Sequence, residues 1–93
     1  MKIGMPDWPK LEKPVVVEVD GFWATWHGGE YIDVYRSETG AQADARGENP
    51  PDGHNAVAPI NTTGDEFDPE TEDPEDYVRT ELRGWIRSEG QYY

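Results

Sequence analysis

The sequence predicts an α+β fold in which a small three-stranded antiparallel β-meander packs against one C-terminal α-helix, with long irregular segments. Residues 14–37 contain short runs of alternating apolar residues separated by glycine turns, as in a meander. Residues 73–90 carry an apolar stripe at helical spacing. Ninety-three residues suit one small domain, so the whole chain, 1–93, is expected to fold as a single unit.

Residues 1–13 are expected to form an irregular N-terminal arm, because three prolines lie within this stretch or next to it. Trp8 and Leu11 give the arm two apolar side chains that can dock on the sheet. The arm lacks the apolar region of a signal peptide, and no run of the chain approaches a membrane span. We therefore expect a cytoplasmic protein, in the host cytoplasm if it is viral, with no membrane partner.

The first predicted turn is Asp20-Gly21, which lies between a valine-rich run and an aromatic run. Asp-Gly is typical of a two-residue type I′ turn, in which both central residues have positive φ. Such a turn fixes the register of the two strands. The expected pairs are Val15 with Trp26, Val16 with Thr25, Val17 with Ala24, Glu18 with Trp23, and Val19 with Phe22.

The second predicted turn is His27-Gly28-Gly29, taken as a three-residue loop in which Gly29 has positive φ. This loop places Ile32 opposite Ala24 and Val34 opposite Phe22. The period of two then divides the meander into an apolar inner face and a mixed outer face. The outer face carries Val16, Glu18, Trp23, Thr25, Tyr31, Asp33 and Tyr35.

Residues 38–72 are expected to form a long irregular acidic segment. Its composition favours turns, most clearly at residues 50–53. Residues 57–60 are compatible with a short edge strand, because Pro59 is tolerated at a sheet edge. A connection of this length is either functional or a plain excursion from the domain.

The predicted C-terminal helix spans residues 73–90. Asp73 is a good N-cap, and Pro74 suits the first helical position. The apolar stripe is expected to cover the inner face of the sheet. The shared core would then contain Val17, Phe22, Trp26, Leu82 and Ile86.

The formal net charge is −12, and −8 of it lies in residues 65–76. A chain with 20 acidic and 8 basic residues is a poor direct ligand for nucleic acid or anionic membranes, where binding depends on Lys and Arg. The charge favours a basic protein surface as the partner, such as that of a nucleic-acid-binding protein. The alternative interpretation is that the acidity serves solubility or tolerance of high salt.

Within residues 65–76, five acids have no evident task at the start of the helix: Asp65, Glu66, Asp68, Glu70 and Glu72. Twelve extended residues span about 40 Å, so one charge falls about every 5 Å. A DNA strand presents one phosphate per ~3.4 Å of axis, so the segment is able to imitate a phosphate backbone. A solvated loop and a hard-cation site are the alternatives.

Two smaller surfaces are further candidates. Trp23, Tyr31 and Tyr35 share the predicted outer face and suit a protein-binding patch, unless residues 1–13 or 38–64 fold over them. The arginines of the predicted helix recur at every fourth position, which suits either internal ion pairs or contact with an anion: Arg79, Arg83 and Arg87.

The sequence gives no catalytic motif, and we expect a protein that is not an enzyme and that holds no cofactor or metal. There is no cysteine, and the two histidines have no ligand at metal spacing. The chain is therefore interpreted as a small acidic interaction protein, an inhibitor that binds a basic surface by phosphate mimicry. In size and charge it resembles small acidic inhibitors that viruses make against host defences. The alternative is a structural or assembly subunit that docks through the aromatic face.

Overall fold

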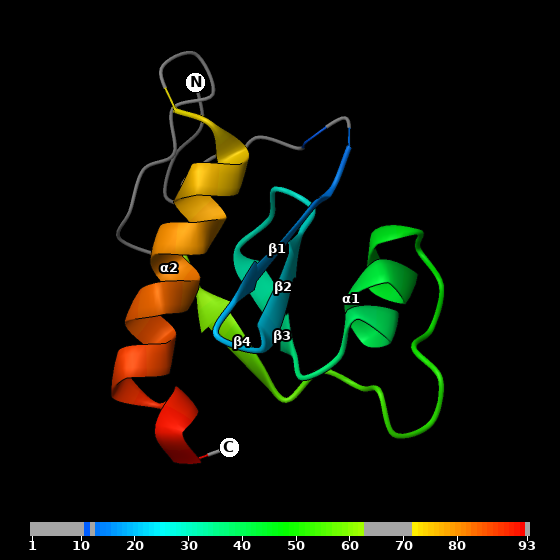
Figure 1. Ribbon diagram of the computed structural model, residues 1–93. Coiled ribbons are helices and arrows are strands. Elements are labelled where there is room, and N and C mark those ends of the chain that lie inside the picture. Colours follow the sequence, from blue (N-terminus) through cyan, green and yellow to red (C-terminus); the bar gives the residue numbers. More distant parts are fainter. Residues whose placement is uncertain (1–10, 12, 63–71, 93) are drawn as a thin grey trace.

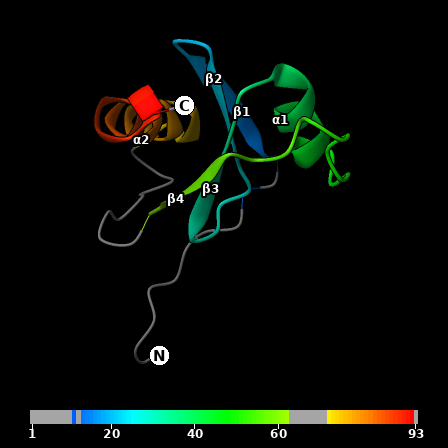
Figure 2. The same cartoon turned by 90° about the horizontal axis from the view of Figure 1, so that it is seen from below.

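The computed structural model of the chain describes residues 11, 13–62 and 72–92. A four-stranded antiparallel sheet, with strand order β1-β2-β3-β4, lies between two helices (Figures 1 and 2). The α+β class is as predicted, but the sheet has four strands rather than three, and there is a second helix. The elements are β1 (Val15–Val19), β2 (Phe22–Trp26), β3 (Tyr31–Tyr35), α1 (Glu38–Ala45), β4 (Ala58–Asn61) and α2 (Pro74–Ser88).

The β1–β2 hairpin has the predicted turn and register. Asp20 and Gly21 have φ values of 51° and 83°, as a type I′ turn requires. All five expected cross-strand pairs are present, from Val15 with Trp26 to Val19 with Phe22. The Glu18 carboxylate accepts a hydrogen bond from the Gly21 N–H at 2.8 Å, which braces the turn.

The predicted β2–β3 register is wrong by two residues, because Ala24 pairs with Val34 and not with Ile32. The loop is longer than three residues, and its positive φ of 95° falls at Gly28 rather than at Gly29. The Trp26 indole N–H donates to the Gly29 carbonyl at 2.9 Å and holds this wider loop. A shift of two residues leaves every side chain on its predicted face.

The inner face of the sheet forms the core with α2, as predicted. Trp26 and Leu82 are fully buried, and the Phe22 ring meets the Trp85 ring edge-on with centroids 5.2 Å apart. Ile86 is partly buried and packs against the same cluster. The buried members are Val17, Phe22, Ala24, Trp26, Ile32, Val34, Ile60, Val78, Leu82 and Trp85.

Residues 38–72 are not irregular throughout, because α1 and β4 both form within them. β4 begins and ends one residue later than the predicted edge strand, and it pairs with β3. α1 lies on the face of the sheet opposite α2 (Figure 2). Its buried residues are all small: Gly40, Ala41 and Ala43.

Close packing of α1 depends on a glycine. A Cβ at Gly40 would collide with the backbone carbonyl of His54 and with the ring of Tyr35. The helix begins after Ser37, whose hydroxyl accepts a hydrogen bond from the Gly40 N–H at 3.3 Å. The same hydroxyl lies 2.7 Å from Nδ1 of His54, which ties the following loop to the start of the helix.

α2 has the predicted N-cap, with the Asp73 side chain accepting from the Glu75 N–H at 3.2 Å. The helix ends at Ser88, two residues before the predicted end. A short 3-10 helix, η1 (Gly90–Tyr92), follows it.

Candidate functional site

The twelve residues 65–76, called the acidic segment from here on, are described only at their C-terminal end, from Glu72. Asp65, Glu66, Asp68 and Glu70 lie outside the described residues, and Glu72 is exposed. The acids that follow Glu72 are exposed as well: Asp73, Glu75 and Asp76.

Asp73, Glu75 and Asp76 also have local tasks at the start of α2. Asp76 forms an ion pair with Arg79 at 2.8 Å, and Glu75 lies 3.8 Å from the same guanidinium. The expected Glu75–Arg79 pair is therefore present. At the described end of the segment, the carboxylates lie at the N-terminus of α2 and face solvent. The helix dipole stabilises negative charge at this end of the helix.

The three outer-face aromatic residues do not form one exposed patch. Tyr31 is 50 % exposed and Trp23 is partly buried, whereas only 4 % of Tyr35 is exposed. α1 covers Tyr35, whose hydroxyl donates a hydrogen bond to the Asp44 carboxylate at 2.8 Å. The alternative in which part of residues 38–64 folds over this face is the one that the structure shows.

Beneath α1 lies a polar cluster that the sequence analysis did not identify, made of His27, Asp33, Tyr35 and Asp44. Asp44, on α1, is its centre and is only 17 % exposed. Oδ2 of Asp44 accepts from Tyr35, and Oδ1 lies 2.9 Å from Nε2 of His27 in the β2–β3 loop. A side-chain hydrogen bond also links Asp44 to Asp33 on β3. The cluster therefore joins α1 to the sheet and to one of its turns.

The two carboxyl groups of the cluster have opposite pKa shifts. Burial, followed by the hydrogen bond and the negative charge of Asp44, raises the pKa of Asp33 to about 6. Burial also acts to raise the pKa of Asp44, but hydrogen bonds from Asp33, His27 and Tyr35 outweigh it, and the net shift is downward. Burial and the contact with Asp44 raise the pKa of the Tyr35 phenol. Below about pH 6 the pair thus holds one proton, which resides on Asp33, and this proton is released as the pH rises through about 6.

The polar cluster serves as a structural attachment for α1. A carboxyl that titrates near neutral pH is a feature of many active sites. The part of the chain that the structure describes contains no group of three or more His, Asp or Glu residues suited to hold a metal ion. The one signal in the sequence was Asp33, an acid at a position flanked by the apolar residues of a strand. The partner Asp44 was not foreseeable, because α1 was not predicted.

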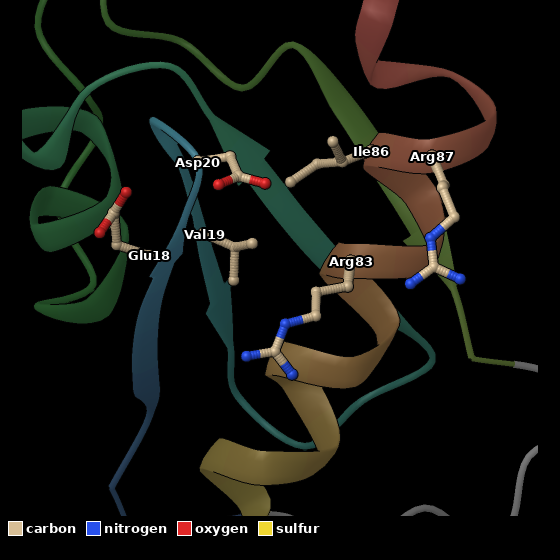
Figure 3. Close-up of a pocket in the computed structure, with 6 residues that line it drawn as sticks. All are labelled: Glu18, Val19, Asp20, Arg83, Ile86 and Arg87. Carbon is tan, nitrogen blue, oxygen red and sulfur yellow. The ribbon is translucent and has the colours of Figure 1, made fainter.

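A second charged feature is an open groove between the β1–β2 turn and α2, with a volume of about 400 Å³ (Figure 3). Arg83 and Arg87 project from α2, and the Asp20 side chain extends from the turn on the opposite side. Both arginines are exposed and form no ion pair with the described residues. Val19 and Ile86 give the lining of the groove its apolar part. Opposite charges on its two walls suit a partner segment that carries both signs.

No protein-family model, curated protein or solved structure matches this chain. The fold and the candidate surfaces are therefore described from the residues of this chain alone. Within the described ranges, no helix is long and apolar enough to cross a membrane.

Proposed function

We propose that this protein is a non-enzymatic binding protein that occupies a basic surface on another protein through the acidic segment, residues 65–76. The observation that carries the proposal is the concentration of charge, −8 of the net −12, in these twelve residues. The helix start accounts for Asp73, Glu75 and Asp76, which cap α2 or pair with Arg79. The remaining five acids have a spacing that suits recognition by Lys and Arg.

The start of α2 at Pro74 limits the stretch that can lie along a partner in extended form to residues 65–73. Nine extended residues reach about 30 Å, and six of these nine are acidic, which gives one charge about every 5 Å. Phosphates on a nucleic-acid strand are spaced by ~3.4 Å along the axis, which is comparable. A nucleic-acid-handling protein is the class of partner that this spacing fits, and occupation of its basic groove would inhibit it.

The structure gives less support to docking through the aromatic face. A platform of Trp23, Tyr31 and Tyr35 requires three exposed rings, and Tyr35 is covered by α1 with its hydroxyl bonded to Asp44. We therefore propose no second function, and substitution of the exposed Tyr31 becomes a control.

The test compares two variants with the same net charge of about −7, each with five acids converted to their amides. The first changes the acids of the segment: Asp65, Glu66, Asp68, Glu70 and Glu72. The matched control changes five exposed acids elsewhere: Asp20, Glu38, Glu48, Asp52 and Glu89. Partners are recovered with the unmodified chain at low salt, and affinities are then measured at two salt concentrations.

We expect the segment variant to lose most of its affinity and its salt dependence, mainly through slower association, while the control stays near the unmodified protein. Both variants should melt close to the unmodified protein, because exposed acids contribute little to stability. Equal losses in the two variants would mean that net charge alone drives binding. Unchanged binding in both, with loss on Tyr31→Ala, would transfer the site to the sheet face.

A further inference from the structure

The two edges of the sheet differ in what they offer to another strand. Thr62 donates its backbone N–H to the Glu30 carbonyl, so even-numbered residues of β4 direct their backbone groups toward β3. Odd-numbered residues of β4 therefore face outward, and one of them is Pro59, which has no N–H. The β4 edge is thus protected in the way that natural sheets commonly protect edges.

The same alternation can be followed across the sheet to β1. Even residues of β3 face β4, so its odd residues face β2, and Asp33 pairs with Thr25. Even residues of β2 then face β1, where Ala24 pairs with Val17. The backbone groups that remain at the outer edge of β1 belong to Val16 and Glu18.

Among the described strands, β1 lies at the end of the sheet and has a neighbour on one side only. No described residue forms a hydrogen bond with the N–H or C=O groups of Val16 and Glu18. Val15, Val16 and Val19 are only partly buried, so the edge also carries β-branched side chains on both faces. Two donors, two acceptors and a valine-rich surface form a template for strand addition.

We propose that β1 pairs antiparallel with β1 of a second copy of this chain, with the twofold axis at Val17. Val16 then lies opposite Glu18 of the second copy, and the two such pairs form four backbone hydrogen bonds. On the inner face, Val17 meets Val17 of the second copy, and Val15 meets Val19 of the second copy. The pairing joins two four-stranded sheets into one of eight strands.

The sequence of the edge selects this register over its neighbours. A shift that centres the axis on Glu18 sets the two Glu18 side chains directly opposite each other, which is unfavourable. A shift that centres it on Val16 sets Glu18 opposite Pro14, which lacks an N–H. The register centred on Val17 avoids both faults and also brings the exposed Lys13 close to Asp20 of the second copy. The strand is therefore complementary to itself.

Each copy carries a net charge of −12, so the two copies repel each other at long range. Salt screens this repulsion, because the Debye length falls from about 14 Å at 0.05 M to about 4 Å at 0.5 M. Pairing should therefore tighten as salt rises. Binding of a basic partner through the acidic segment should weaken, so the two interactions are distinguishable.

The experiment measures self-association of the full chain by sedimentation equilibrium, from micromolar to about millimolar concentration, at both salt levels. Val16→Lys places a cation opposite Glu18 of the second copy, and Val16→Glu places a like charge there. Because the twofold axis generates two copies of this contact, each substitution acts twice in the dimer. We therefore expect the Kd values for self-association of the two variants to differ by about tenfold or more. Glu18→Lys added to Val16→Glu should restore the association.

Hydrogen exchange provides a readout that does not depend on the variants. In the unmodified chain, the amides of Val16 and Glu18 should become protected as concentration rises, while the outward-facing amide of Asn61 on β4 should not. A chain that is monomeric at about millimolar concentration and high salt would overturn the proposal. Equal Kd values for Val16→Lys and Val16→Glu would overturn it as well. So would protection of the Val16 and Glu18 amides that does not change with protein concentration.

Discussion

The pair of carboxyl groups under α1 makes stability depend on pH in a direction that can be calculated. Folding raises the pKa of Asp33 from 3.8 to about 6, so the folded state holds this proton more tightly than the unfolded chain does. The stability contributed by protonated Asp33 is fully present below pH 3.8 and is lost as the pH rises through about 6. The pKa of Asp44 is lowered, so its contribution is lost only in more acidic solution and changes little across this window.

The substitution Asp33→Asn removes the charge and keeps an N–H donor for Asp44. A shift of about two pKa units corresponds to about 3 kcal/mol, at 1.36 kcal/mol per unit. Because Asp33 is only partly buried, solvent screening reduces the expected effect to about 1–2 kcal/mol. Relative to the unmodified protein, the variant should gain this stability as the pH rises from about 4 to about 7 and show no further gain above that.

Urea unfolding at half-unit pH intervals measures the difference, with tryptophan fluorescence, to which the buried Trp26 and Trp85 contribute, as the signal. Asp52→Asn is the matched control, since it makes the same chemical change at an exposed position in the loop after α1. A difference between Asp33→Asn and the unmodified protein that is constant with pH would refute the coupling between Asp33 and Asp44. So would a variant that is less stable than the unmodified protein at pH 7.

Three further substitutions in the two helices are tested by the same unfolding measurement. Gly40→Ala should cost about 1–3 kcal/mol or more, because the new methyl group collides with the His54 carbonyl, and an unchanged stability would mean that α1 does not pack closely. Gly84→Ala should instead gain up to about 1 kcal/mol, since a Cβ at this exposed helical position meets open space. Leu82→Ala should cost about 2–5 kcal/mol, because Leu82 is fully buried under the sheet, and a loss below about half a kcal/mol would show that α2 does not cover this core.

The sequence was sufficient for the elements whose pattern is local. The Asp20-Gly21 turn fixes the register of β1 with β2, and the apolar stripe of α2 specifies which side faces the sheet. The second hairpin was not predictable from the local pattern alone. Its turn residues, His27, Gly28 and Gly29, are compatible with more than one loop length. In the observed loop the Trp26 indole N–H donates to the Gly29 carbonyl, a contact that the sequence pattern does not indicate, and a shift of two residues leaves the face pattern unchanged.

The candidate surfaces were also predictable only in part, because local sequence patterns do not show which residues pack above a surface. The charge of the acidic segment can be counted from the sequence, whereas the exposure of Tyr35 depends on what packs above it. Tyr35 lies on the predicted outer face, but the tight approach of Gly40 and the hydrogen bond to Asp44 bury it. The polar cluster joins residues from three separate elements, and no spacing along the chain indicates it.

α1 was missed because almost nothing in its own sequence stabilises it. It has eight residues, fewer than the roughly 12–15 that an isolated helix needs, and it contains a glycine and no large apolar side chain. Its position is fixed by polar contacts instead, since the Thr25 hydroxyl donates to the Ala41 carbonyl at 2.8 Å and Asp44 holds three side chains of the sheet and its loop. Small residues permit this, because they bring the helix backbone close enough to the sheet for such bonds to form. α1 is therefore held by polar contacts that leave no apolar pattern in its sequence. Because one of these contacts joins Asp44 to Asp33, α1 is the element whose docking responds most directly to the ionisation of Asp33.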